Sequence, residues 1–260
     1  MGRDKDRDSE AADLSYEGGR LRLYVEAPLL AGARVTPDEG QAHYLLHVMR
    51  AKEGRRVLLF NGRDGEWRAR IAEVSRRGCT LVCEAQTEPQ AEVPDLWLAF
   101  APVKKTPADY VAQKATELGV RVLQPVITSR TVARRVNLER LRANAIEAAE
   151  QSGRLSVPEV HAPLGLDALL KSWPDGRRLL FCDEGGDARS IADALERGEA
   201  TEAWGVLTGP EGGFDPTERA LIRSQAFVLP VTLGPRIMRA DTAALGALAV
   251  WQAIRGDWRT

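Results

Sequence analysis

The sequence predicts an α/β domain preceded by a smaller strand-rich domain, and three patterns along the chain carry this prediction. Residues 20–88 contain short apolar or alternating runs separated by turn pairs such as Asn61-Gly62 and Asp64-Gly65, which is typical of a small β-barrel. Residues 89–94, with proline at each end, indicate a linker. Residues 95–260 alternate strand-like and helix-like segments, which favours a parallel sheet covered by helices.

The first domain is expected to begin after a disordered tail. Residues 1–19 alternate acidic and basic side chains and offer little apolar surface to bury. The strand-like runs that follow are Leu21/Leu23/Val25, 57–60, 67–71 and 80–84, with a helix-like insert at 38–50. Cys79, Leu81 and Cys83 would share one face of the last of these strands, so we expect them to be buried.

The second domain contains five apolar runs of strand length, separated by helical patterns. The runs are 96–101, 120–126, 179–182, 203–207 and 227–233. Thr106 and Pro107 are typical of a helix start, and Gly119 of its end. A second helix is predicted at 137–152, and Asp215-Pro216-Thr217-Glu218 is a capping sequence for a later one. Residues 242–254 predict a buried helix, since they are too short to span a membrane.

The charge of the whole chain does not identify a partner, but its distribution favours a polyanion. The formal net charge is −1. Residues 20–88 nevertheless hold eleven Arg and one Lys against nine acidic residues, and residues 130–154 hold six Arg against three Glu. Basic surfaces within a neutral protein fit a nucleic acid. A solvated arginine-rich surface explains the counts nearly as well.

The cysteine content and the absence of an apolar leader indicate the compartment. The three cysteines are too few for a disulfide framework, and no cysteine or histidine cluster has zinc spacing. No signal-like apolar segment opens the sequence. We therefore expect a cytoplasmic protein with free thiols, without a metal and without a membrane segment.

Two glycine- and proline-containing loops are the most informative motifs. Leu207-Thr208-Gly209-Pro210-Glu211-Gly212-Gly213-Phe214 follows one apolar run, and Leu233-Gly234-Pro235-Arg236-Ile237-Met238-Arg239-Ala240-Asp241-Thr242-Ala243 follows the next. Glycine allows a backbone to approach a ligand closely, and we expect Gly212 to serve in this way. Two such loops at neighbouring strand ends predict a pocket walled by backbone donors and acceptors.

These loops resemble the signature loops of the SPOUT methyltransferases, and specifically the ribosomal RNA small subunit methyltransferase E family. Further segments are similar to that family: His43 to Arg50, Phe60-Asn61-Gly62, Gln113 to Val120 and Glu147 to Arg154. The resemblance implies a C-terminal SPOUT α/β domain with a deep trefoil knot, preceded by a small PUA-like β-barrel domain. It also implies transfer of a methyl group from S-adenosylmethionine to N3 of a uridine in 16S rRNA of the small ribosomal subunit.

The resemblance also implies the residues of the site. The residues placed against the methyl donor are Asp183, Glu184, Leu207, Thr208, Gly209, Pro210, Glu211, Gly212, Gly213, Leu233, Gly234, Ile237, Met238, Arg239, Thr242 and Ala243. Arg239 is the first choice for a cation that stabilises the uridine anion, with a structural ion pair as the alternative. Asp241 stands where the family has Glu, and either accepts the proton or, with slight preference, caps the last helix.

The expected RNA contacts are His43, Arg50, Arg130 and Arg154, together with Lys104, which keeps a basic position of the family. His43 could equally pack inside the small barrel. Departures from the family pattern occur at Pro107, Ser129 and Leu141, where the family has a basic residue, Glu and Trp. They bear on the RNA surface around Arg130 more than on donor binding. The last helix is apolar on nearly all sides and is expected to lie in a homodimer interface.

Two other functions stay open, and a third is excluded. A SPOUT enzyme could methylate another position, such as a tRNA ribose 2′-hydroxyl, and a protein with this fold could act as a non-catalytic RNA-binding assembly factor. A phosphate-binding NTPase is excluded, because no Gly-Lys-Ser/Thr follows a glycine loop. The exact nucleotide and the need for assembled subunits do not follow from the sequence.

Overall fold

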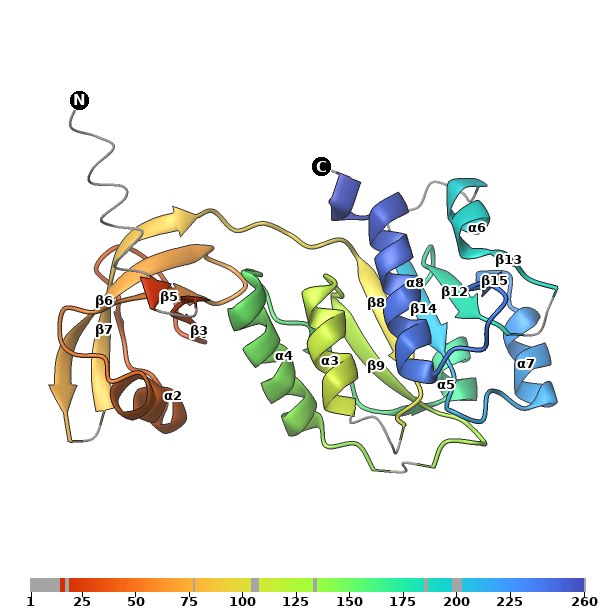
Figure 1. The fold of residues 1–260 in the computed structure, drawn as a ribbon, viewed down its shortest axis with the longest axis horizontal. Helices are drawn as coiled ribbons and strands as arrows, with labels where there is room; N and C mark the ends of the chain where they lie inside the picture. Colours follow the sequence, from red (N-terminus) through yellow and green to blue (C-terminus); the bar gives the residue numbers. More distant parts are fainter. Residues whose placement is uncertain are drawn as a thin grey trace. The chain divides into compact units, whose positions relative to one another are not determined.

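The computed structural model of the chain describes residues 15–16, 19–76, 78–103, 108–132, 135–184, 187–197 and 203–259. The chain divides into two compact units: residues 1–92 with 149–156, and residues 93–148 with 157–260. The boundary between Glu92 and Val93 lies within the predicted linker. Each unit has its own sheet and its own hydrophobic core (Figure 1).

The larger unit is built on a parallel sheet. In chain order its described strands are β8 (Leu96–Phe100), β9 (Val122–Ile127), β10 (Glu159–Val160), β11 (Leu164–Gly165), β12 (Arg178–Cys182), β13 (Arg189–Ser190), β14 (Trp204–Thr208) and β15 (Val228–Thr232). Their spatial order is β10-β9-β8-β14-β12-β15-β13, with β11 also beside β9. All of these pairings are parallel, so the predicted parallel α/β sheet is confirmed.

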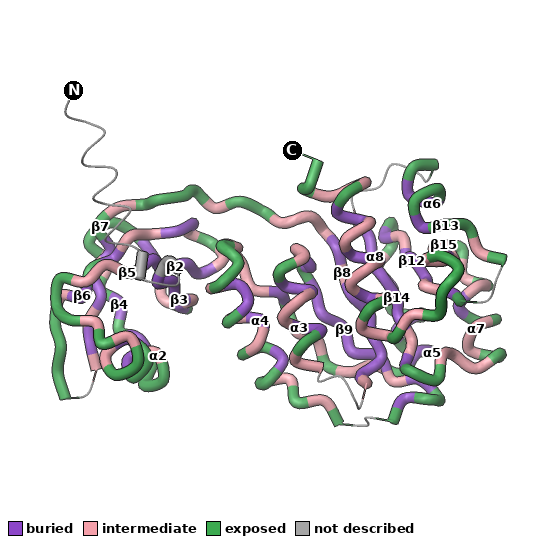
Figure 2. The backbone as a smooth tube through the Cα atoms, viewed as in Figure 1, coloured by how far each residue is buried: buried purple, intermediate pink, exposed green. Residues whose placement is uncertain are grey.

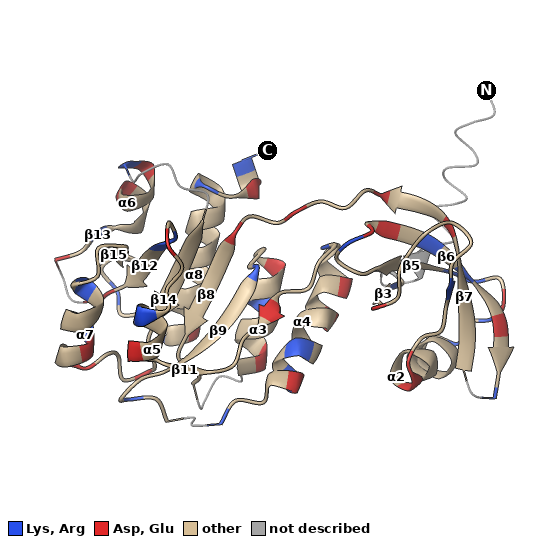
Figure 3. Cartoon of the chain, turned by 180° about the vertical axis from the view of Figure 1, so that it is seen from behind, with Lys and Arg blue, Asp and Glu red and all other residues tan. Residues whose placement is uncertain are grey.

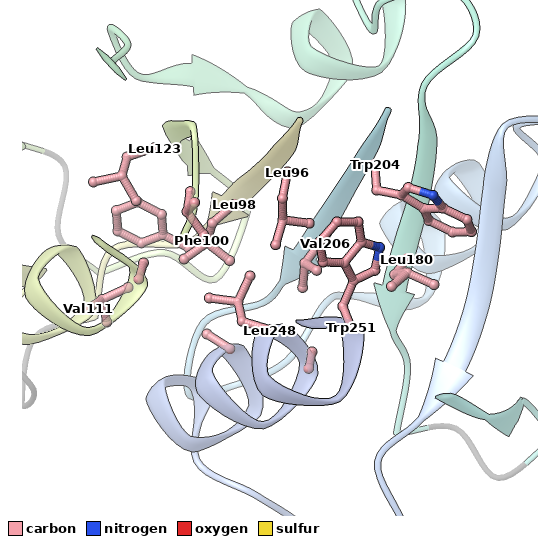
Figure 4. Packing of buried hydrophobic residues seen from close by; sticks show 14 of the residues in the cluster. Leu96, Leu98, Phe100, Val111, Leu123, Leu180, Trp204, Val206, Leu248 and Trp251 are labelled. Carbon is pink, nitrogen blue, oxygen red and sulfur yellow. The ribbon is translucent and has the colours of Figure 1, made fainter. Parts of the chain in front are cut away.

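Helices cover both faces of this sheet. One face packs against α3 (Ala108–Glu117), α4 (Leu138–Ser152), α6 (Ile191–Arg197) and α8 (Ala240–Ile254). The other packs against α5 (Leu166–Lys171) and α7 (Pro216–Arg223). Figure 4 shows Leu248 and Trp251 of α8 beside Val206 of β14. Strands buried on both faces are continuously apolar, which is why the sequence shows runs and not alternation.

The helix starts test the capping predictions. Asp215 is the N-cap of α7 and forms a capping box with Glu218, as predicted. The N-cap of α8 is Arg239, two residues before Asp241, so the preference for Asp241 as cap is wrong. Asp241 lies inside the first turn. The predicted cap at Thr106 lies outside the described residues.

The smaller unit contains a five-stranded sheet among its described residues. Its strands are β3 (Arg22–Tyr24), β4 (Arg34–Val35), β5 (Arg56–Phe60), β6 (Glu66–Ser75) and β7 (Gly78–Glu88), in the order β3-β5-β6-β7-β4. The pairing of β3 with β5 is parallel and the others are antiparallel. Cys79, Leu81 and Cys83 are buried in its core, as predicted. Figure 2 shows buried segments in both units.

The predicted helical insert at 38–50 is two helical segments in sequence. Helix α2 (Glu39–His43) begins at a capping box between Asp38 and Gln41. It continues without a break into a π-helical turn, η1 (Tyr44–Val48). The N–H of Met49 donates to the carbonyl of Tyr44 at 2.9 Å, which is the wider hydrogen-bond spacing of a π-helix.

A buried arginine holds residues 149–156 in the smaller unit. Arg22 donates to Glu66 at 2.7 Å, and its guanidinium lies 4.5 Å from the centroid of the Phe60 ring. It also donates to the carbonyls of Ala149 at 2.8 Å and Glu150 at 3.0 Å. A cation at the last carbonyls of a helix is favoured by the helix dipole. No local feature of the sequence indicates this contact.

Part of the predicted disordered tail is ordered, and the helices can be compared with the length of a membrane span. Strand β1 (Ser15–Tyr16) pairs with β2 (Gly19–Arg20), so these residues depart from the expected disorder of 1–19. For residues 1–14 the disorder stays a prediction. Within the described part of the chain, no helix has the length and apolarity needed to cross a bilayer.

Candidate functional site

A pocket of about 300 Å³ lies in the larger unit, at the carboxyl ends of β12, β14 and β15. We call it the strand-end pocket. The two loops that the sequence analysis singled out both line it, and the residues after β12 form a third wall. Its volume is within the range of small-molecule sites.

The strand order explains why a pocket forms here. β12 lies between β14 and β15, so the chain leaves β12 on one side and later crosses to its other side. Connections that diverge at such a point leave a crevice outside the carboxyl ends of the strands, where α/β proteins bind ligands. The site therefore follows from the topology of the sheet.

The loop after β14 is a tight turn. The N–H of Gly213 donates to the carbonyl of Pro210 at 2.8 Å, and Gly213 has a φ of +66°. A Cβ at Gly209 would lie 2.7 Å from the Phe214 ring. Phe214 in turn contacts Phe181 edge to face, with ring centroids 5.2 Å apart. Gly213 is therefore required for its backbone conformation, and Gly209 is required because a side chain there would clash with Phe214.

Contacts from the end of β9 hold the same loop in place. Arg130 Nη1 donates to the carbonyl of Gly212 at 2.7 Å. Ser129 Oγ lies 2.7 Å from an Asp215 oxygen and 2.9 Å from a Glu218 oxygen, so the two carboxylates share its one proton, and the Ser129 N–H donates to Glu218 at 2.7 Å. These bonds and the N–H groups of α7 lower the pKa of Asp215, with the Ser129 bond as the largest cause.

The position of Gly212 differs from the sequence expectation. It does not line the strand-end pocket, and a Cβ there would meet Arg130 Cδ at 3.6 Å, an ordinary contact. Gly213 lines the pocket instead, and a Cβ there would lie 2.9 Å from Glu184 Oε1. The glycine that the geometry requires beside the pocket is therefore Gly213.

The two acidic residues after β12 have different surroundings. Asp183 is buried, and both of its oxygens accept from Arg219 Nε, at 2.8 and 3.0 Å. Arg223 Nε lies 2.9 Å from the same carboxylate (Figure 3 shows the charges on α7). The bond to Asp183 raises the pKa of Arg219. Asp183 thus anchors α7 to β12, whereas Glu184 is exposed and faces the pocket.

Arg219 lines the pocket and was not foreseen. It lies on α7, 36 residues after Asp183, and a single arginine on an amphipathic helix carries no distinguishing signal. Cys182 also lines the pocket. Burial raises the pKa of its thiol to about 12, so it stays a neutral thiol and does not act as a base.

The loop after β15 is held by fewer contacts. Thr232 Oγ1 bonds with Gly234 at 3.3 Å, and Ile237 is 89% exposed although it lines the pocket. Arg239 is exposed at the start of α8. The Asp241 carboxylate accepts from the N–H of Thr242 at 2.8 Å.

The structure brings most of the predicted donor-contact residues together. Those that line the pocket are Asp183, Glu184, Thr208, Gly209, Pro210, Glu211, Gly213, Leu233, Gly234, Ile237, Met238 and Ala243. Those that do not are Leu207, which is buried in β14, and Gly212, Arg239 and Thr242. Their roles toward the donor stay predictions.

None of the predicted RNA contacts that the structure describes is among the residues that line the strand-end pocket. His43 and Arg50 are exposed in the smaller unit, and Arg154 Nε donates to Ser156 at 3.2 Å in the same unit. Lys104 and the departure at Pro107 lie outside the described residues. Leu141 is buried in the core of the larger unit, so this departure repacks the core and does not alter a surface.

Comparison with known proteins gives the family. Residues 90–252 match the family described as RNA methyltransferase domain, and residues 37–83 match the RNA methyltransferase PUA domain. Ribosomal RNA small subunit methyltransferase E of Synechocystis is 33% identical over 237 residues, covering 90% of this chain and 77% of the relative. The chain belongs to the ribosomal RNA small subunit methyltransferase E family. The resemblance found in the sequence is thereby confirmed.

Two further members of the methyltransferase E family span nearly the same length. The protein of Rickettsia conorii is 30% identical over 233 residues, covering 88% of this chain and 93% of its own. The solved structure of the Neisseria gonorrhoeae protein, bound to S-adenosylmethionine, is 29% identical with a TM-score of 0.82. That match covers 92% of this chain and 99% of the neisserial chain. The protein is therefore an RNA methyltransferase.

Proposed function

We propose that the protein transfers a methyl group from S-adenosylmethionine to N3 of a uridine in 16S rRNA of the small ribosomal subunit. The observation that carries the proposal is the meeting of both family loops in one pocket at the point where the strand order reverses. The names of the two curated relatives and the donor held by the neisserial protein support it.

The residues of the strand-end pocket fit this donor. Glu184 offers an exposed carboxylate to ribose hydroxyls, and no described residue forms a bond with it. Residues 208–210 and 233–234 line the same space, and backbone groups of such loops can read an adenine edge. Val231, Leu233 and Ile237 supply apolar surface. The mixture of apolar walls and a few polar groups is that of a nucleoside site.

The chain has to position two reactants and manage one proton. S-adenosylmethionine supplies a methyl group that is already activated by its sulfonium, so orientation is the main requirement. Arg239 can donate two hydrogen bonds from its guanidinium to a uridine carbonyl and stabilise the anion as it forms. Asp241, one turn or less away on α8, accepts the N3 proton directly or through a water.

A homodimer is part of this proposal. Ala244, Ala247, Leu248 and Trp251 of α8 face the core of their own unit. Leu245 and Ala249, four residues apart on another side of the helix, stay half-buried and are apolar. We place this side against the same helix of a second copy. Leu245→Asp should give a monomer in sedimentation equilibrium at micromolar concentration; a monomeric and fully active wild type would contradict the pairing.

Two finer features of the fold belong to the same proposal. The crossover from β14 past β12 to β15 supports a deep trefoil knot in which the segment after β15 is threaded. The five-stranded sheet of the smaller unit, with its single core, supports a PUA-like barrel that holds RNA through His43 and Arg50. Lys104, Arg130 and Arg154 complete the proposed RNA contacts.

Methylation of small ribosomal subunits tests the proposal. Subunits that lack the modification are incubated with labelled donor, and the product nucleoside is identified by mass spectrometry. We expect 3-methyluridine, and we expect Arg239→Ala to lower kcat at saturating RNA with little change in donor affinity. Arg135→Ala, which removes an equal charge from an exposed position outside the pocket lining, is the control. A 2′-O-methyl product would indicate another target, and donor binding without any product would indicate an assembly factor.

A further inference from the structure

The exposed face of α2 and η1 combines features that a merely structural helix does not need. Tyr44 is 40% exposed and Val48 is 59% exposed. His43 and His47 are exposed, with ring centroids 5.0 Å apart. Arg50 follows them and is also exposed. We call these five residues the α2–η1 face.

The backbone of this face is unusual. The π-helical turn Tyr44–Val48 inserts an extra residue into the helix, and such turns occur frequently at functional sites. Arg50 has a φ of +51°, and it is the one non-glycine residue with positive φ that the structure describes. Helices commonly end on such a residue, and glycine adopts it without strain. A side chain kept at a position where glycine is more stable suggests a role for that side chain.

The chemistry of the face identifies its ligand. Bases of unpaired RNA stack on aromatic and histidine rings, and each such contact tolerates any base because every base has a π-face. A cation beside the rings holds the adjoining phosphate. The α2–η1 face supplies both within the segment that matches the RNA methyltransferase PUA domain.

We propose that the α2–η1 face is a stacking site for unpaired bases of the RNA, with Tyr44 and His47 as the platform and Arg50 as the phosphate contact. The inference rests on the proposed function only in taking RNA as the ligand. It adds to the contacts predicted for His43 and Arg50 a mode of recognition, base stacking, and two further residues. It also explains why the helix is widened, because the π turn spreads neighbouring side chains over a broader surface.

Two kinds of substitution separate stacking from charge. Tyr44→Ala removes a ring and should weaken binding of unmodified small subunits by roughly 10-fold, without changing how affinity depends on salt. Tyr44→Phe keeps the ring and should bind like wild type. Arg50→Gly should instead lower the slope of log affinity against log salt by about 0.7. It should also raise the melting temperature, because glycine relieves the left-handed conformation.

Tyr110 on α3 is a matched control, since it is 41% exposed and lies in the other unit. Tyr110→Ala should leave binding unchanged. Equal losses for Tyr44→Ala and Tyr110→Ala, or a loss for Tyr44→Phe as large as for Tyr44→Ala, would overturn the stacking site. An Arg50→Gly variant that is less stable than wild type and binds small subunits with normal affinity would also overturn it. Binding is measured without donor, so a wild type that depends on Tyr44 but methylates no subunit would refute the proposed function alone.

Discussion

The two loops of the strand-end pocket differ in how firmly they are held. The loop after β14 is fixed from outside by Arg130 at the Gly212 carbonyl and from within by the turn of Gly213 onto Pro210. The loop after β15 has the Thr232–Gly234 contact at 3.3 Å, and its Ile237 is almost wholly exposed. One wall of the pocket is therefore preformed, while the other depends on what binds to it.

Because of this difference, the two loops should lose different amounts of conformational entropy when a ligand binds. A preformed wall loses little conformational entropy when a ligand arrives, whereas an exposed wall has to be ordered by the ligand or by a second subunit. Substitutions in the first loop should therefore act through its geometry, and their effect should appear in donor binding before any RNA is present.

The largest effect is expected at Gly213. Valine there would have to adopt a φ of +66° with its Cβ 2.9 Å from Glu184 Oε1, and a β-branched residue is a strong outlier in that region. Gly213→Val should reduce affinity for S-adenosylmethionine by about 100-fold or more, measured by calorimetry. This factor corresponds to a cost of about 3 kcal/mol for the strained backbone or for the rearrangement that relieves it.

Gly212→Val is the matched control for this change. Its Cβ would lie 3.6 Å from Arg130 Cδ, and no left-handed conformation is required there. Donor affinity should stay within about threefold of wild type, since surface substitutions of this kind change stability by only about 0.5 kcal/mol. A larger loss of donor affinity for Gly212→Val than for Gly213→Val would show that Gly212, and not Gly213, is the glycine that the pocket requires.

A smaller effect is expected from the arginine that holds this loop. Arg130→Ala removes the 2.7 Å bond to the Gly212 carbonyl and should lower donor affinity by about 10-fold in the absence of RNA. The bond is exposed, which limits its contribution. Arg135→Ala removes an equal charge from an exposed position five residues later and serves as control. Indistinguishable donor affinities for the two variants would show that Arg130 serves RNA alone.

The sequence predicted the parts of this site that depend on local chemistry. The Asp215 cap, the apolar strands and the two glycine-rich loops are each encoded within a few residues, so they could be located without a structure. The parallel sheet then follows from the alternation of strands and helices, and it brings the loops together at the carboxyl ends of β14 and β15.

What the sequence did not reveal depends on contacts between distant segments. Asp183 lines the pocket as expected, but its bonds with Arg219 on α7 were not foreseen. Leu141 was treated as part of a surface, yet it is buried. Arg22 reaches the carbonyl of Ala149, 127 residues later, and so draws the end of α4 into the smaller unit. Pairings of this kind have no signature in local sequence, because each partner alone is an ordinary residue.

The smallest effect concerns the acid stability of the preformed wall. The pKa of Asp215 is lowered in the folded protein, chiefly by the Ser129 hydroxyl and then by the N–H groups of Glu218 and Thr217. A carboxyl with a depressed folded pKa contributes stability that is fully present above its unfolded pKa of about 3.9 and is lost as pH falls through the folded value.

Asparagine caps a helix as well as aspartate but does not titrate in this range. The stability of wild type relative to Asp215→Asn should therefore be constant above about pH 5 and shrink below about pH 4. Ser129→Ala removes the largest cause of the lowered pKa of Asp215. In that background the stability advantage of Asp215 over the Asp215→Asn change should be smaller, and it should be lost at a higher pH. Urea midpoints measured from pH 2 to pH 7 follow both variants, and a difference between wild type and Asp215→Asn that does not change with pH would refute the assignment.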